Sequence, residues 1–280
     1  TQLNRSSRLL RGVDEEVVAR FEEAASKQWN IVKDASLSEI RENADGSVTV
    51  VAKRTTENGE ELLEIPADAV LVATGRRPNT DTLNAKNYFD VQDGGQLSVD
   101  KYQRVLYNGA PVPGVYALGD VSSRYQLKHV ANHEARVVQH NLSHPEDLRA
   151  SDHRYVPAAV FSNPQIAVVG MTEEQARQAA EREGFEITVK AQNFGDTAYG
   201  WAMEDKIGLC KLIARKDNGV LLGAHLVGEE SSVLIQPLLQ AMSFGMDART
   251  LARGQYWIHP ALTEIIENAL LGLEFDEPAN

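Results

Sequence analysis

The chain has 280 residues, more than one domain usually contains, so two or three folded units are expected. Its net charge of −12 argues against nucleic acid and anionic membranes as partners, because both bind basic surfaces. No apolar run approaches the roughly 20 residues that a membrane-spanning helix needs. Cys210 is the single cysteine, which excludes an intramolecular disulfide and is typical of a cytoplasmic protein. The polar start, without an initiator Met, indicates that further sequence precedes it.

The first predicted element is an amphipathic helix over Val13–Trp29, with Asp14 as its N-cap. Two alternating segments, Ser47–Lys53 and Glu61–Ile65, flank a turn-like sequence and predict a β-hairpin. The continuous apolar run Ala67–Ala73 then predicts a fully buried strand. Helical and strand patterns therefore mix in this first part of the chain.

A second buried strand is predicted at Gly114–Leu118, followed by a helix over Val130–Leu142. The chain turns polar around His144–His153, which predicts a domain boundary. Beyond it, strands precede a group of closing helices, and this grouping favours an α+β unit. The strands are predicted at Ala158–Phe161, Ile166–Val169, Ile187–Gln192, Ile207–Ala214 and Leu221–Val227, and the helices after Thr172 and at Ser232–Phe244 and Pro260–Leu273.

The segment Val115–Asp120 reads VYALGD and ends a predicted strand in Gly119 and Asp120. Such a carboxylate lies at the carboxyl end of a strand, where α/β sheets bind their ligands, and it can accept hydrogen bonds from sugar hydroxyls. The alternative is an aspartate that caps the next turn. The hexapeptide alone leaves both interpretations open.

An earlier segment, Ala73–Asn79, reads ATGRRPN and comes before VYALGD, with Pro111 and Pro113 between the two. This pair of segments resembles the signature of the FAD-dependent pyridine-nucleotide disulfide reductases. The resemblance implies that Gly75 and Arg76 mark a crossover between nucleotide domains and that Gly119 and Asp120 bind the flavin.

The implied fold class is a partial, Rossmann-like α/β nucleotide-binding region followed by an α+β dimerisation domain. Its implied divisions are 1–74 for part of the NAD(P)-binding domain, 75–150 for the returning segment of the FAD-binding domain, and 151–280 for the dimerisation domain. The implied cofactors are FAD and NADPH.

Leu127, Lys128 and His129 enter the helix that, by the same resemblance, points its amino terminus at the flavin. Unpaired N–H groups and the helix dipole can stabilise negative charge there. We therefore interpret all three as candidate flavin contacts. For His129 an ordinary histidine at a helix start is an equal alternative.

Arg5, Arg8 and Arg11 precede the first helix. Where a dinucleotide fold binds NAD, an acidic residue accepts the ribose 2′-hydroxyl, whereas arginines accommodate the 2′-phosphate of NADP. Arg5 and Arg11 resemble the NADPH-selecting members of the family, and Arg8 fits the pattern less well. A solvated basic stretch is the alternative.

The last motif is His259-Pro260-Ala261-Leu262-Thr263-Glu264. Histidine titrates near neutral pH, so it can exchange a proton with a thiolate, and a carboxylate on its far nitrogen fixes the tautomer. Pro260 is predicted at the first position of a helix. Spacing alone favours a surface histidine. The resemblance instead implies that His259 is the acid/base acting across a dimer interface, oriented by Glu264, with Ala261 in place of the family's usual Thr.

The stretches Ala198–Asp205, Gln236–Gly245 and Ala252–Trp257 are most similar to the mycothione reductases and less similar to lipoamide dehydrogenases or glutathione reductases. The resemblance implies the carboxyl-terminal part of a homodimeric reductase of a low-molecular-weight disulfide, converting mycothione to mycothiol. Two alternatives remain: a non-catalytic dimerisation module, and part of a related disulfide reductase.

The chain alone is expected to be inactive, because it lacks the family's Cys-x-x-x-x-Cys pair and any Gly-x-Gly-x-x-Gly loop. Cys210 lies between apolar neighbours and is interpreted as a core residue. No metal site is predicted: His133-Glu134 begins like a zinc-protease motif, but Val137 stands where the second histidine belongs.

Overall fold

A computed structural model describes residues 1–276, so the last four residues of the predicted dimerisation domain lie outside it. The chain divides into two compact units, one formed by Thr1–Leu71 with Pro157–Asn280 and the other by Val72–Val156. The three-way division of the chain into domains stays a prediction.

The amino-terminal helix α1 spans Glu15–Ser26 and is shorter than the predicted Val13–Trp29. Its predicted N-cap is confirmed, because the Asp14 side chain accepts the N–H of Glu16 at 3.1 Å. Its buried face packs through Val17 and Phe21 with apolar residues of the dimerisation sheet described below. Two short parallel strands, β1 and β2, flank the helix in sequence at Gln2–Leu3 and Ile31–Val32.

A three-stranded antiparallel sheet follows, with β4 (Val48–Thr56) between β3 (Ala35–Glu42) and β5 (Gly59–Ala67). The predicted hairpin is confirmed by β4 and β5, whereas β3 was not predicted. The predicted buried strand Ala67–Ala73 is wrong: β5 ends at Ala67 and the residues after it are exposed. An apolar run needs a neighbouring strand to pair with, and none lies alongside these residues in the described chain.

The unit Val72–Val156 contains a two-stranded ribbon, β6 (Arg104–Tyr107) and β7 (Ala110–Tyr116), and the long helix α2 (Lys128–Ser143). The predicted strand at Gly114–Leu118 is therefore wrong in its start and in its burial, because β7 pairs with β6 alone and exposes Gly114. The helix is confirmed and starts two residues before the predicted Val130. Two 3-10 turns complete the unit, η1 (Ala85–Asn87) and η2 (Gly119–Val121).

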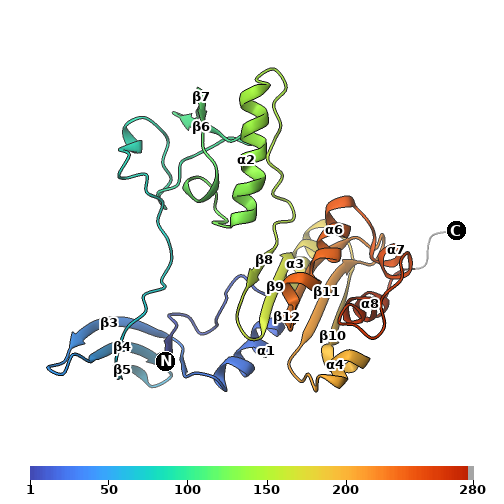
Figure 1. The fold of residues 1–280 in the computed structure, drawn as a ribbon, viewed down its shortest axis with the longest axis horizontal. Helices are drawn as coiled ribbons and strands as arrows, with labels where there is room; N and C mark the ends of the chain where they lie inside the picture. The colour runs from blue at the N-terminus through green and yellow to red at the C-terminus, as the bar shows by residue number, and fades with distance from the viewer. Residues whose placement is uncertain (277–280) are drawn as a thin grey trace. The chain divides into compact units, whose positions relative to one another are not determined.

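The carboxyl-terminal part is built on a five-stranded antiparallel sheet in the order β10-β11-β12-β9-β8 (Figure 1). All five predicted strands are present. The strands are β8 (Ala158–Val160), β9 (Gln165–Gly170), β10 (Ile187–Asn193), β11 (Leu209–Arg215) and β12 (Leu221–Gly228). The other elements are α3 (Glu173–Glu183), η3 (Phe194–Asp196), α4 (Ala198–Ala202), α5 (Ser231–Leu234), α6 (Gln236–Phe244), α7 (Ala248–Arg253) and α8 (Glu264–Leu271).

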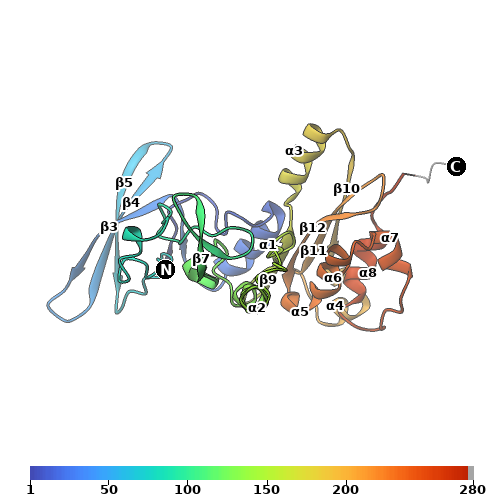
Figure 2. The ribbon, with the colours of Figure 1, turned by 90° about the horizontal axis from the view of Figure 1, so that it is seen from above.

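Helices cover both faces of this sheet, with α3 on one side and α6 and α8 on the other (Figure 2). On the α3 side, the side chain of Lys211 in β11 bonds to Asp14 of the α1 cap at 2.9 Å and to Glu173 of α3 at 2.7 Å. The N-cap of α3 is a capping box, in which Thr172 and Gln175 exchange hydrogen bonds. These contacts fix α1 and α3 on the sheet.

Two predicted helices of the carboxyl-terminal part are also shorter than expected. The predicted helix Ser232–Phe244 is broken at Ile235 into α5 and α6, because Pro237 in the first turn of α6 has no N–H to continue the α5 ladder. The prediction of Pro260 at a first helical position is wrong, since α8 begins at Glu264. Within the described residues, no helix is both long enough and apolar enough to cross a membrane.

Candidate functional site

His259 and Glu264 form a close pair just before and at the start of α8. The Nδ1 atom of His259 lies 2.7 Å from Oε1 of Glu264, and the other carboxylate oxygen accepts the N–H of Ala261 at 3.2 Å. The segment 259–263 therefore turns back over the first residue of α8, which explains why the helix cannot begin at Pro260. An ionised carboxylate only accepts hydrogen bonds, so the proton of the pair lies on Nδ1.

The two partners of this pair differ in exposure. The His259 side chain is 67% exposed, whereas that of Glu264 is 16% exposed. The hydrogen bond from His259, together with the Ala261 N–H, lowers the pKa of the Glu264 carboxyl below its ordinary value. Glu264 is therefore ionised at neutral pH and orients the imidazole, which leaves Nε2 able to give or take a proton.

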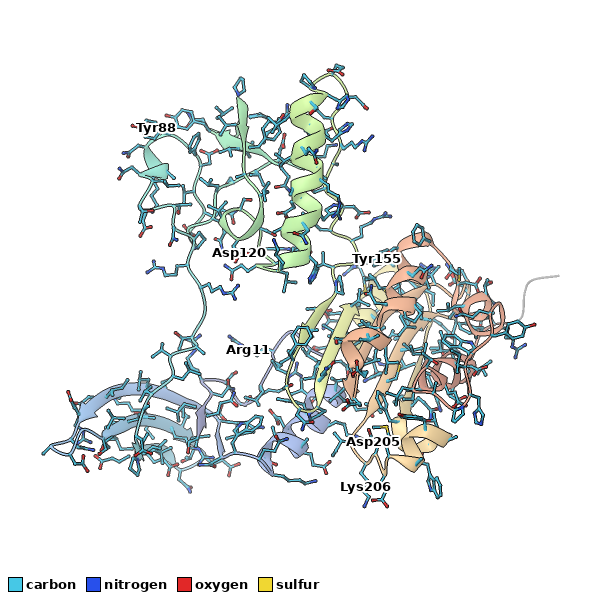
Figure 3. All side chains as sticks on the ribbon, in the orientation of Figure 1. Arg11, Tyr88, Asp120, Tyr155, Asp205 and Lys206 are labelled. Carbon is cyan, nitrogen blue, oxygen red and sulfur yellow. The ribbon has the colours of Figure 1, made fainter. Side chains whose placement is uncertain are left out.

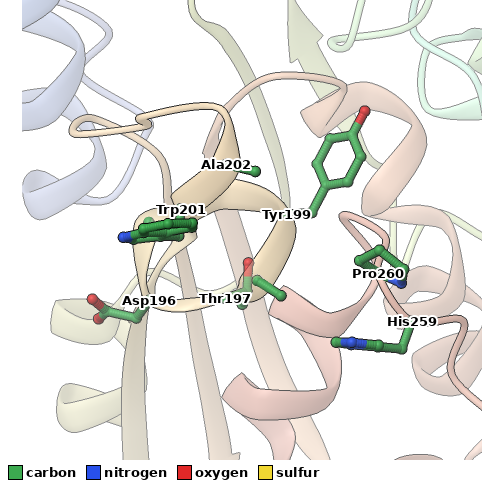
Figure 4. Close-up of a pocket in the computed structure, with 9 residues that line it drawn as sticks. Asp196, Thr197, Tyr199, Trp201, Ala202, His259 and Pro260 are labelled. Carbon is green, nitrogen blue, oxygen red and sulfur yellow. The ribbon is translucent and has the colours of Figure 1, made fainter.

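A shallow open pocket lies beside this pair (Figure 4). His259 and Pro260 form one wall, and Thr197, Tyr199 and Trp201 at α4 form the other. An acid/base side chain beside aromatic surface is a setting suited to a small-molecule ligand. Neither aromatic residue was predicted as part of a site, because α4 and His259 are far apart in sequence and no spacing rule links them.

Asp120 lies in η2, beside the amino-terminal end of α2 (Figure 3). Its carboxylate is exposed and lies 3.4 Å from the guanidinium of Arg76. The structure thus brings together the two predicted segments around Arg76 and Asp120. Gly75 precedes Arg76 at a positive φ of 126°, a backbone conformation that favours glycine.

The amino terminus of α2 begins after Leu127, whose side chain cannot cap the helix. The N-cap residue Leu127 thus makes no side-chain hydrogen bond to the helix, and Lys128 adds a positive charge there. Lys128 and His129 are both exposed, and Leu127 is half-buried. This end of α2 fits an electron-rich or anionic group such as the edge of a flavin.

Arg5 and Arg11 are exposed on the loop that leads into α1. Arg8, between them, is occupied in another way: its guanidinium donates to the carbonyl oxygens of Arg11 and Val13 at 3.3 and 2.9 Å. Arg8 thus orders the loop, which leaves Arg5 and Arg11 as the two exposed guanidinium groups of the predicted set.

Cys210 lies near the start of β11 and is fully buried, as expected. Burial raises the pKa of its thiol to about 12, so it is not a thiolate at neutral pH. Within residues 1–276, no three or more His, Cys, Asp or Glu side chains gather where they could hold a metal ion.

Two family descriptions match the chain. "Pyridine nucleotide-disulphide oxidoreductase" matches residues 1–135, and "Pyridine nucleotide-disulphide oxidoreductase, dimerisation domain" matches residues 156–270. The order of these matches confirms the predicted fold class.

Among curated proteins, mycothione reductase of Mycobacterium tuberculosis (strain H37Rv) is 51% identical over 278 residues, which cover 98% of this chain and 57% of that protein. Dihydrolipoyl dehydrogenase of Geobacillus stearothermophilus is 32% identical and covers 96% of this chain and 54% of that protein. The predicted resemblance to mycothione reductase is confirmed by the higher identity. The chain spans little more than half the length of these relatives.

Among solved structures, the HOCl-induced flavoprotein disulfide reductase RclA from Escherichia coli superposes with a TM-score of 0.81 at 26% identity. The match covers 96% of this chain and 58% of that one. Sequence models, relatives and structures agree on one assignment: the chain belongs to the pyridine nucleotide-disulphide oxidoreductase family.

Proposed function

We propose that the chain is the carboxyl-terminal part of an NADPH- and FAD-dependent reductase of a low-molecular-weight disulfide, with mycothione as the substrate and mycothiol as the product. The observation that carries this proposal is the 2.7 Å contact between Nδ1 of His259 and Oε1 of Glu264, with the imidazole 67% exposed. A histidine that is oriented on one side and open on the other is suited to exchanging protons with a substrate.

The role of His259 is that of general acid toward sulfur. When a thiolate attacks the substrate disulfide, the sulfur–sulfur bond breaks and the departing sulfur carries a negative charge. His259, as imidazolium, gives that sulfur a proton from Nε2 and becomes neutral, while Glu264 holds Nδ1 throughout. The attacking thiolate comes from outside this chain, because Cys210 is its single cysteine and is buried.

The cofactors are assigned by fit. Asp120 and Gly119, with Gly75 and Arg76 nearby, are proposed to hold the polar part of FAD. The N–H groups at the start of α2, with Leu127, Lys128 and His129, face the flavin edge in this proposal. When bound, FAD supplies the step that passes electrons from NADPH to thiols. Arg5 and Arg11 are proposed to recognise the 2′-phosphate of NADPH.

The partner is proposed to be a second copy of the chain, bound through the dimerisation domain. Several large apolar side chains of that domain are exposed in the single chain, among them Val233, Phe244, Tyr256 and Ile258. Exposed apolar residues in such number are typical of a surface that another protein covers. Tyr256 and Ile258 immediately precede His259, so the covering copy lies next to the acid/base pair. The cytoplasm remains the predicted compartment.

The test uses the longer flavoprotein that carries this chain and replaces His259 by Gln. We expect turnover with mycothione to fall about 10²- to 10⁴-fold, the usual contribution of a general acid. Reduction of the flavin by NADPH, followed in a stopped-flow spectrometer, is expected to stay unchanged because it does not use the imidazole. Glu264→Gln keeps a hydrogen-bond acceptor for the imidazole, so its turnover with mycothione is expected to lie between that of the unchanged protein and that of His259→Gln. Unchanged turnover in His259→Gln contradicts the proposal.

Activity with oxidised glutathione or lipoamide in preference to mycothione points to a related disulfide reductase instead. The identities of 51% and 32% favour mycothione. The second alternative, a non-catalytic dimerisation module, is favoured by the exposed apolar residues alone. A purified 280-residue chain that forms a dimer, is colourless and reduces no disulfide with NADPH is consistent with both that alternative and the inactivity expected of the part. Turnover of the longer protein therefore decides between a dimerisation module and part of a reductase.

A further inference from the structure

Glu134 on α2 is a buried carboxylate that has no role in the proton transfer or cofactor contacts proposed above. The residue is 1% exposed and lies on the buried face of the helix with Val130 and Val137. An ionised carboxylate is costly to bury unless its oxygens are satisfied. Both oxygens of Glu134 have partners, and these partners come from two different segments.

The first partner is the backbone of the Gly119–Asp120 turn. The N–H of Gly119 donates to Oε2 of Glu134 at 2.6 Å, and both groups are buried. Gly119 has a positive φ of 69°, and a Cβ at this position would lie 3.2 Å from the Cβ of Ala131 on α2. The turn that presents Asp120 is therefore pressed closely against α2 and attached to it by Glu134.

The second partner is His153, on the segment after α2. Its Nε2 atom lies 3.0 Å from Oε1 of Glu134, with the geometry of an ion pair rather than of a hydrogen bond. Neighbouring contacts fix His153 there. The hydroxyl of Tyr125 donates to the His153 carbonyl oxygen at 3.3 Å, and Nε2 of His133 accepts the N–H of Asp152 at 3.2 Å.

We propose that Glu134 is a positioning residue that fixes the Gly119–Asp120 turn for flavin binding, with His153 as the second contact that holds its carboxylate in place. This proposal rests on the proposed function for the identity of the ligand. The position of the turn itself depends only on the contacts of Glu134. A charged acceptor holds the Gly119 N–H more strongly than a neutral one.

The first experiment measures FAD release from the longer flavoprotein. In Glu134→Ala we expect FAD to dissociate about tenfold faster, the usual effect of losing a buried hydrogen bond to a charged group. Glu134→Gln and His153→Phe are expected to give smaller increases, because the Gly119 N–H keeps an acceptor in both. The matched control is Gln139→Ala, an exposed position on the same helix, which is expected to release FAD as the unchanged protein does. Equal release rates in Glu134→Ala and the control overturn the proposal.

The second experiment needs no flavin and uses the 280-residue chain. Hydrogen exchange at the Gly119 amide, followed by NMR, is expected to be slow in the unchanged chain and in Glu134→Gln, and at least about tenfold faster in Glu134→Ala. Equal protection in all three shows that Glu134 does not hold the turn. If the longer protein binds no FAD at all, the proposed function fails, while the exchange rates at Gly119 still decide whether Glu134 positions the turn.

Discussion

Two apolar segments of the chain have opposite environments. In β11 (Leu209–Arg215) the side chains of Leu212 and Ile213 are fully buried, whereas Leu71, in the segment 68–73, is 91% exposed. Both segments read as apolar strands. β11 pairs with β10 on one side and β12 on the other, and helices cover both faces of its sheet. The segment 68–73 has no strand beside it in the described chain.

The difference shows that an apolar run becomes a strand only where neighbours supply hydrogen bonds and cover. Backbone N–H and C=O groups must be paired before they can be buried, so apolar side chains cannot drive a lone segment into a core. The five antiparallel strands of the dimerisation sheet lie between residues 158 and 228. The buried strands of that sheet therefore have neighbours within this stretch, whereas the segment 68–73 has no such neighbour among the described residues.

The first prediction has the largest expected effect and tests the buried ion pairs of Lys211 in β11. Lys211→Met removes the cation that contacts Asp14, Glu173 and Glu16 together, and only Glu173 keeps another cationic partner, Arg177, among the described residues. Breaking a buried ion pair at one partner usually costs about 3–5 kcal/mol, and we expect the free energy of unfolding to fall by that amount in a urea titration. The matched control is Lys206→Met, at an exposed position, with an expected change below about 0.5 kcal/mol. Equal losses of unfolding free energy in the two variants contradict a stabilising role for the buried ion pairs of Lys211.

The pH dependence of this network follows from two pKa shifts. Burial is the largest single influence on both groups and opposes their charge. At Asp14 the hydrogen bonds from Lys211 and from the N–H of Glu173, with the attraction of the Lys211 charge, together outweigh it and lower the pKa, while hydrogen bonds to Glu173 and Asp14 raise the pKa of Lys211 to about 12. The lowered Asp14 pKa stabilises the fold above the ordinary carboxyl pKa, and this contribution is lost in acid. The raised Lys211 pKa stabilises the fold below the ordinary lysine pKa and is lost as the pH rises through about 12. The cost of Lys211→Met is therefore expected to be constant around neutral pH.

The second prediction compares the two apolar segments directly. Ile213→Ala leaves a cavity in a fully packed sheet and is expected to lower the free energy of unfolding of the 280-residue chain by about 2–5 kcal/mol. Leu71→Ala is expected to change it by less than about 0.5 kcal/mol, because the side chain is already in water. Urea titrations of both variants give the comparison. A loss above about 2 kcal/mol in Leu71→Ala shows that the segment is buried in solution.

Local signals in the sequence predicted local features well. The caps of α1 at Asp14 and of α3 at Thr172 follow from single side chains that satisfy nearby N–H groups, and the structure has both. The pairing of His259 with Glu264 also lies within one turn of chain, so spacing and family resemblance were enough to predict it. These features need no knowledge of distant residues.

Features that depend on distant residues were missed. The pocket wall at Trp201 and the partner of Glu134 at Gly119 both join segments that no spacing rule connects. Glu134 was considered only as half of a zinc motif, although its burial gives it another role. The start of α8 was misplaced because the side chain of Glu264 is used to hold His259 and Ala261, which a helical periodicity does not reveal.

The third prediction tests the N-cap of α3, the helix that covers one face of the same sheet. Thr172→Ala removes the hydroxyl that accepts the N–H of Gln175, and the expected cost is about 1 kcal/mol of unfolding free energy. Thr172→Ser keeps the hydroxyl and is expected to recover most of the loss. Thermal unfolding of the three proteins gives the order. If Thr172→Ser lowers the unfolding free energy as much as Thr172→Ala does, the hydroxyl cap does not stabilise the start of α3.

The smallest expected effect concerns His259 and separates function from stability. Exposed ion pairs contribute at most about 1 kcal/mol, so His259→Gln is expected to lower the unfolding free energy of the chain by less than that, although the same change is expected to abolish most turnover in the longer protein. Because the hydrogen bond from His259 lowers the pKa of Glu264, the pair stabilises the fold above the ordinary carboxyl pKa, and this contribution is lost as the pH falls through the lowered value. Unfolding in urea at neutral and at acidic pH is therefore expected to show a small difference between the two proteins that shrinks as the pH falls. A loss of about 3 kcal/mol at neutral pH indicates instead that His259 holds the turn before α8 together, and the exposure of its ring is then no sign of a catalytic role.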